Sequence, residues 1–156
     1  MSNILKLILS LVICQLAGFI GAIFTMDSIP TWYAALNKPS FNPPNNVFGP
    51  VWTILYVMMG ISMFLIWKEG LKNKDVKNAF IFFIIQLILN ALWSVVFFGA
   101  HSVLGGLIII VLLWLAVLYC IISFRKISRV ASILLIPYLL WITFATLLNY
   151  YILILN

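Results

Sequence analysis

The sequence predicts an all-α membrane protein, a single bundle of five transmembrane helices that spans residues 1–156. Hydrophobic residues make up 65% of the chain and charged residues only 8%, whereas soluble domains average roughly 45–50% apolar and about 25% charged residues. The mean hydropathy is +1.22. A chain of this composition has too few polar residues to cover a soluble globule, so we expect lipid to surround it.

Five apolar runs account for most of the chain, at about residues 4–24, 47–67, 79–100, 103–124 and 130–155. Each is close to the roughly 20 residues that a helix needs to cross a bilayer. We predict helices because a single helix satisfies its own backbone in lipid, and because the runs lack the alternation of a membrane β-strand. No small-residue cleavage site follows the first run, so we interpret it as a retained span.

The cations predict the orientation of the bundle. Eight of the nine Lys and Arg residues fall at the N-terminus and in the second and fourth connections, and only Lys38 falls on the opposite side. Short loops on the cytoplasmic side of membrane proteins carry an excess of Lys and Arg. The sequence therefore predicts a cytoplasmic N-terminus and an external C-terminus.

The connection between the first two runs, residues 25–46, is long and polar or aromatic. Five of the six prolines fall in or beside it, which predicts a stiff segment rather than a flexible one. Long ordered loops usually have a function. We expect this loop to cap a cavity in the bundle; the alternative is a plain connector with interfacial aromatic residues.

Several classes of function are disfavoured. No charged residue lies near the middle of a span, which argues against a proton-driven exporter. His101 is the only histidine, and Cys14 and Cys120 both lie inside apolar runs, so we predict no metal site and no bound cofactor. The net charge of +6 is explained by topology, and no aromatic and basic surface favours nucleic acid.

Uncharged polar and aromatic residues recur at helical spacing within the spans, which predicts that these faces turn inward. They are Trp52, Tyr56, Met59 and Met63; Gln86, Asn90, Trp93 and Phe97; and Pro137, Trp141 and Ala145. A cavity lined by indoles, a phenol and an amide suits a flat, largely apolar ligand with a few polar groups. Interfacial aromatic belts and hydrogen bonds between helices are the alternative explanation.

Three blocks of the sequence resemble the TspO/MBR family, the translocator proteins once called peripheral benzodiazepine receptors. The blocks are WYAALNKPSFNPP (32–44) with the following FGPVWTILY (48–56), LNALW (89–93) with FFGA (97–100), and PYLLW (137–141) with FATLLNYY (144–151). They cover nearly the whole chain in the family's order.

The resemblance implies a five-helix bundle, commonly a homodimer, whose first loop closes a ligand cavity. It implies binding of porphyrins such as protoporphyrin IX, and of synthetic benzodiazepine-type and isoquinoline-carboxamide ligands. The positions that match the family's pocket are Tyr33, Trp52, Tyr56, Asn90, Trp93, Trp141 and Ala145. The small-residue pairs Ala17/Gly21 and Gly18/Ala22 permit close helix packing and give weak support to a dimer.

The resemblance leaves the physiological role open among porphyrin transport, sensing and stress regulation. An alternative is light-dependent degradation of the porphyrin, in which Trp52 and Trp141 match the tryptophans credited with that chemistry. A third hypothesis is a structural or regulatory partner whose cavity is incidental.

The family's animal members carry a basic residue just beyond the tyrosine of a cholesterol-recognition stretch. Here residues 152–156 follow Tyr151 and contain no Lys or Arg, so cholesterol binding is not supported. The short N-terminus and the absence of an organelle signal favour a bacterial inner membrane.

Overall fold

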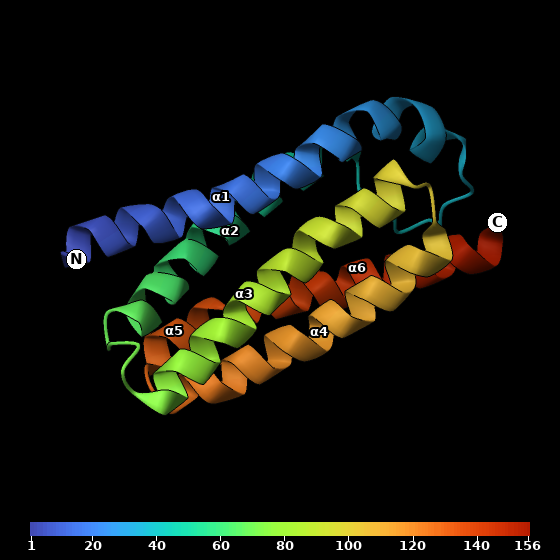
Figure 1. Cartoon of the computed structure of the whole chain (residues 1–156). Helices are drawn as coiled ribbons and strands as arrows, with labels where there is room; N and C mark the ends of the chain where they lie inside the picture. Colours follow the sequence, from blue (N-terminus) through green and yellow to red (C-terminus); the bar gives the residue numbers. More distant parts are fainter.

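The computed structural model describes all 156 residues as a bundle of long helices without strands. Five helical segments are long and apolar enough to cross a membrane: Asn3–Tyr33, Asn45–Trp67, Lys74–Gly99, Val103–Arg125 and Arg129–Leu155. The two termini lie at opposite ends of the bundle (Figure 1). The predicted five-helix membrane fold is confirmed.

The first helix is longer than predicted. Helix α1 (Asn3–Ser28) begins at a Ser2 cap and continues into the π-helical turn η1 (Ile29–Tyr33). The polar hydroxyls do not interrupt it, because Thr25 and Thr31 donate to carbonyls of their own helix, Gly21 O at 2.8 Å and Asp27 O at 2.6 Å. Pro30 lies at the start of η1, where the wider turn accommodates a residue without an N–H.

The predicted loop of residues 25–46 is therefore wrong in its extent. The non-helical connection comprises only residues 36–44, and Asn45 already begins helix α2 (Asn45–Trp67). Only three of the five prolines assigned to this loop region lie within this connection, because Pro30 is in η1 and Pro50 lies inside α2.

The third span also begins before its apolar run. Helix α3 (Lys74–Ser94) starts at Asn73, whose side chain accepts from the backbone N–H of Asp75 at 2.9 Å. It continues into a second π-helical turn, η2 (Val95–Gly99). Helix α4 (Val103–Arg125) follows after a short turn that contains His101, which has a φ of 54°.

The last span is divided, where the sequence predicted one run from 130 to 155. Helix α5 (Arg129–Leu134) is followed by Leu135 as its cap, and helix α6 (Ile136–Leu155) carries Pro137 in its first turn. Proline lacks an N–H, so Pro137 cannot bond to the carbonyl of Ile133 four residues earlier, and the helical hydrogen bonds are interrupted there. Ser62 on α2 donates to Ala131 O of α5 at 2.7 Å and ties the short helix to the bundle.

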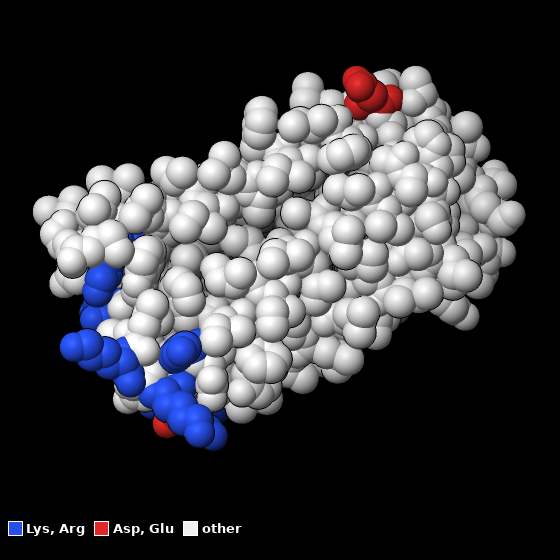
Figure 2. Space-filling model, in the orientation of Figure 1, with Lys and Arg blue, Asp and Glu red and all other residues white.

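Charge is concentrated at one end of the bundle. Lys and Arg gather where the α2–α3 and α4–α5 connections lie, and the long sides of the molecule are nearly free of charge (Figure 2). The sides instead expose large apolar residues, among them Ile8, Ile88, Ile108, Leu115 and Leu140. An apolar waist with charged residues at the end is what a helix bundle in a bilayer requires.

Both cysteines and the small pairs on α1 are used for packing within the chain. Cys14 and Cys120 are buried and unpaired. A Cβ at Gly21 would lie 2.9 Å from Ser94 Oγ, and one at Gly18 would meet the Tyr56 ring at 2.7 Å or less. These glycines let α2 and α3 approach α1, so they give no support to a dimer.

Candidate functional site

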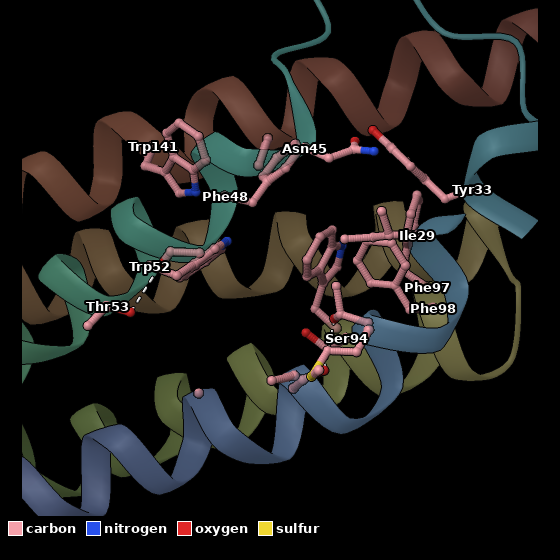
Figure 3. Close-up of a pocket in the computed structure, with 18 of the residues that line it drawn as sticks. Ile29, Tyr33, Asn45, Phe48, Trp52, Thr53, Ser94, Phe97, Phe98 and Trp141 are labelled. Atoms are coloured by element: carbon pink, nitrogen blue, oxygen red, sulfur yellow. Dashed lines mark hydrogen bonds between the residues drawn. The ribbon is translucent and has the colours of Figure 1, made fainter. Parts of the chain in front are cut away.

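A cavity of about 650 Å³ lies in the half of the bundle that is remote from the cationic end. Its walls come from α1, η1, α2, α3, η2 and α6. Figure 3 shows Trp52 and Trp141 on one side of the cavity and Tyr33, Ile29, Phe97 and Phe98 on the other. The volume falls within the roughly 300–1,000 Å³ that is usual for small-molecule sites.

Six of the seven predicted binding residues line this cavity. They are Tyr33, Trp52, Tyr56, Trp93, Trp141 and Ala145. They come from η1, α2, α3 and α6, which are far apart in the sequence. The family resemblance alone predicts Tyr33 here, whereas the helical stripes also predict the other five.

Trp52 is the centre of an aromatic group on the α2 and α6 side. Its ring stacks on Tyr56 with centroids 5.6 Å apart, and it meets Trp141 edge-on at 6.4 Å with the planes at 90°. Phe48 packs against Trp141 from one helical turn earlier on α2, at 6.1 Å. The two indoles to which the light-dependent hypothesis refers are therefore direct neighbours at the wall.

Trp93 forms the opposite wall and is held in a fixed position. Its Nε1 donates to Asn149 Oδ1 at 3.2 Å, and Asn149 Nδ2 donates to Val103 O at 2.9 Å. The Trp93 ring stacks on Phe97, with centroids 5.3 Å apart and planes at 20°. A tethered indole stacked on a buried phenyl ring presents a rigid flat surface.

Asn90 is the one predicted residue that does not line the cavity. It lies buried beneath the wall, where it accepts a hydrogen bond from the Tyr56 hydroxyl and donates to Tyr138 Oη at 2.7 Å. Tyr138 in turn donates to Gln86 Oε1 at 3.0 Å. This polar network joins α2, α3 and α6 beneath the cavity wall.

Tyr33 closes the cavity on the side of the first connection. Its hydroxyl donates to Asn42 Oδ1 at 2.7 Å, so residue 42 of the loop is tied to the wall. Lys38 Nζ donates to Tyr33 O at 2.7 Å and to Leu36 O at 2.9 Å, which satisfies carbonyls at the end of the helix. The only cation at this end therefore folds the loop onto the site.

The sequence itself carries the deciding similarity. A model of the TspO/MBR family matches residues 10–155. The chain belongs to the TspO/MBR family.

The relatives come from bacteria, archaea and animals. The chain is 45% identical to the tryptophan-rich protein TspO of Chlorobaculum tepidum and 46% identical to that of Archaeoglobus fulgidus, each over 99% of the chain and 98% or 99% of the relative. It is 39% identical to the translocator protein of Homo sapiens, over 87% of the chain and 81% of the relative. With its five apolar helices, this TspO/MBR protein is an integral membrane protein.

The wall that α1 contributes was missed in the sequence. Gln15, Gly18, Ala22, Thr25 and Ile29 line the cavity at intervals of three or four residues. The signal was present, because a polar or small residue recurs along one face of an otherwise apolar helix. From the sequence alone, Gly18 and Gly21 are explained equally well as helix-packing positions.

The cavity wall contains no charged residue. No group of three or more His, Cys, Asp or Glu side chains is placed to hold a metal ion. His101 lies outside the wall and stacks on Trp32, with centroids 4.6 Å apart and planes at 10°. The site thus offers aromatic surfaces, hydroxyls and amides, which suit a flat, largely apolar ligand with a few polar groups.

Proposed function

We propose that this TspO/MBR protein binds a tetrapyrrole such as protoporphyrin IX in the aromatic cavity, in a sensory or transport role at the membrane. The observation that carries the proposal is the pair of opposed flat walls, with Trp52 on α2 and the Trp93–Phe97 stack on α3 and η2. Planar aromatic ligands bind well between such surfaces. Relatives bear the names translocator protein and tryptophan-rich sensory protein, which supports this class of role.

The same cavity is proposed to accept the synthetic benzodiazepine-type and isoquinoline-carboxamide ligands, which are flat, mostly apolar and carry few polar groups. The proposal includes a bacterial cytoplasmic membrane as the location, and the match of a bacterial relative over 99% of the chain supports it. A homodimer is part of the proposal by family resemblance.

Equilibrium titration with protoporphyrin IX in detergent tests the binding role. Quenching of tryptophan fluorescence should saturate, and Trp52→Ala should weaken binding by about tenfold, since a stacked aromatic contributes roughly 0.5–1.5 kcal/mol beyond its buried area. Trp67→Ala is the matched control, because Trp67 is on the same helix and does not line the cavity. Equal losses in both variants would argue against this site.

A second function has one specific observation in its favour, the contact between Trp52 and Trp141 at the wall. A photoexcited porphyrin converts O₂ to reactive oxygen, and adjacent electron-rich indoles are oxidisable partners. Under illumination, loss of porphyrin beyond one equivalent per chain, abolished in Trp52→Phe/Trp141→Phe but not in Trp67→Phe, would establish turnover. Tryptophan oxidation without sustained porphyrin loss would leave a binding protein.

A further inference from the structure

The cavity reaches the outer surface of the bundle between α1 and α2. On α2, Asn45, Gly49 and Thr53 line the cavity at intervals of four residues, and all three are exposed. On α1, the lining residues Phe19 and Met26 are 64% and 72% exposed. Residues that belong to both the cavity wall and the outer surface mark the rims of an opening.

The two helices are in close contact near one end and leave a slot toward the other. A Cβ at Gly60 would lie 2.9 Å from the Leu11 Cα, so the two backbones touch there. Nearer the cavity, Gly18 of α1 packs on the Tyr56 ring of α2, and beyond this contact small residues line both helices: Ala22 and Thr25 on α1, and Gly49 and Thr53 on α2. A Cβ at Gly49 would meet nothing within 4 Å, so no atom of α1 or of any other element closes over this lining position.

The slot lies within membrane-spanning segments, whereas the end of the cavity toward the loop is closed. Asn37 N donates to Asn156 Oδ1 at 3.0 Å, and Asn156 Nδ2 donates to Asn37 O at 2.9 Å, so the loop is tied to the end of α6. Phe41 also packs edge-on against Tyr151, at 5.3 Å. A ligand thus meets an open path on the lipid side and a tethered loop on the aqueous side.

One uncommitted polar side chain lies along this path. Gln15 lines the cavity and also a shallow groove on the outer face of α1, together with Leu11, Val12, Leu16 and Phe19. Its amide makes no hydrogen bond within the protein, although amides in lipid normally find a partner. Gln15 is therefore placed to bind a polar group of a ligand that passes from the bilayer into the cavity.

We propose that ligands enter and leave the cavity laterally from the bilayer, through the slot between α1 and α2, and that Gln15 contacts their polar groups. The ligand class is planar and apolar enough to dissolve in lipid, with at least one hydrogen-bonding group. This inference rests on the proposed tetrapyrrole binding and concerns the route alone.

The test uses the full chain in lipid vesicles, with protoporphyrin IX as the probe and its exchange followed by stopped-flow porphyrin fluorescence. Gly49→Phe places a ring in the open slot and should slow both association and dissociation by about tenfold, since the ring raises the barrier to passage. Ile54→Phe is the matched control, because Ile54 is 61% exposed on α2 and does not line the cavity. Thermal unfolding confirms that both variants are folded.

The opposite route is tested by fixing the loop. Cysteines introduced at Asn37 and Asn156 are bridged with a short bis-maleimide; the native Cys14 and Cys120 are fully buried. Lateral exchange predicts unchanged rates in the bridged protein. Exchange that stops on bridging overturns the route, as do unchanged rates in Gly49→Phe, whereas the absence of saturable porphyrin binding in the unmodified chain would overturn the proposed function instead.

Discussion

At the scale of single residues, substitution of Asn90 distinguishes an effect on the stability of the fold from an effect on ligand binding. Its amide connects the hydroxyls of Tyr56 and Tyr138, and only 3% of the residue is exposed. Asn90→Leu leaves two buried hydroxyls without this partner, so we expect the free energy of unfolding to fall by about 1–2 kcal/mol. Because Asn90 does not line the cavity, the affinity for protoporphyrin IX should change little; thermal unfolding and fluorescence titration measure the two effects.

Trp93→Ala is the complementary variant, since Trp93 does line the cavity. It should weaken porphyrin binding by about tenfold, as expected for a stacked aromatic surface. If Asn90→Leu weakens binding as strongly as Trp93→Ala does, the amide contacts the ligand directly and the assignment of Asn90 to a supporting network is wrong.

The candidate site was predictable from the sequence where a periodic stripe of unusual residues marked it. Trp52 and Tyr56 are one turn apart on α2, and Trp141 and Ala145 are one turn apart on α6, so spacing alone brought them to one face. The spacing of residues does not show how far along its helix each one lies relative to the neighbouring helices and the cavity between them. Asn90 lies one turn below Trp93 on the same face, and the cavity ends between them.

At the scale of helices, the contact of α1 with α2 depends on the absence of a side chain at Gly60. A Cβ there would lie 2.9 Å from Leu11 Cα and 3.3 Å from Leu11 N, and backbone atoms cannot move aside as side chains do. We expect Gly60→Ala to cost about 1–3 kcal/mol of stability, the range for overpacking. Gly49→Ala on the same helix meets nothing within 4 Å and should be neutral or slightly stabilising in thermal unfolding; similar effects of the two substitutions would contradict the close crossing.

Lys38 makes some of the contacts that hold the loop of residues 36–44. Lys38 Nζ donates to Tyr33 O and Leu36 O and lies 4.9 Å from the centre of the Tyr33 ring. Lys38→Met removes these bonds and should loosen the loop, which predicts faster limited proteolysis between α1 and α2. Lys72→Met, at the other end of the bundle, is the control, and equal cleavage rates would show that the loop is held by other contacts.

The number, order and type of the helices followed from apolar runs of membrane length, but their ends did not. Hydropathy reports where lipid is preferred, and a helix extends beyond that region when its polar residues find partners within it. Thr31 does so through Asp27 O, and Asn73 does so as a cap ahead of the apolar run. Pro137 has the opposite effect, because it interrupts a helix within an apolar run. The last span is divided into α5 and α6 although the residues on either side are apolar.

At the scale of the whole molecule, the asymmetry of charge predicts how the bundle is oriented. The chain has nine Lys and Arg residues; one, Lys38, lies in the loop that is bonded to Asn156, and the other eight belong to the opposite end, where they gather in Figure 2. The positive-inside rule places that cationic end in the cytoplasm. The cavity and its loop then lie in the external half of the bilayer.

This orientation is measured with reporters fused after Asn156 in a bacterial host. Alkaline phosphatase, which is active only outside the cytoplasm, should be active there, and green fluorescent protein, which fluoresces only when it folds in the cytoplasm, should stay dark. The same reporters fused between Glu69 and Lys72, at the cationic end, should give the reverse pattern. An active phosphatase at both positions would mean that the two ends do not lie on opposite sides of the membrane. An inactive C-terminal phosphatase together with a fluorescent C-terminal green fluorescent protein would show that the bundle has the inverse orientation. The cavity would then take its ligands from the cytoplasmic leaflet.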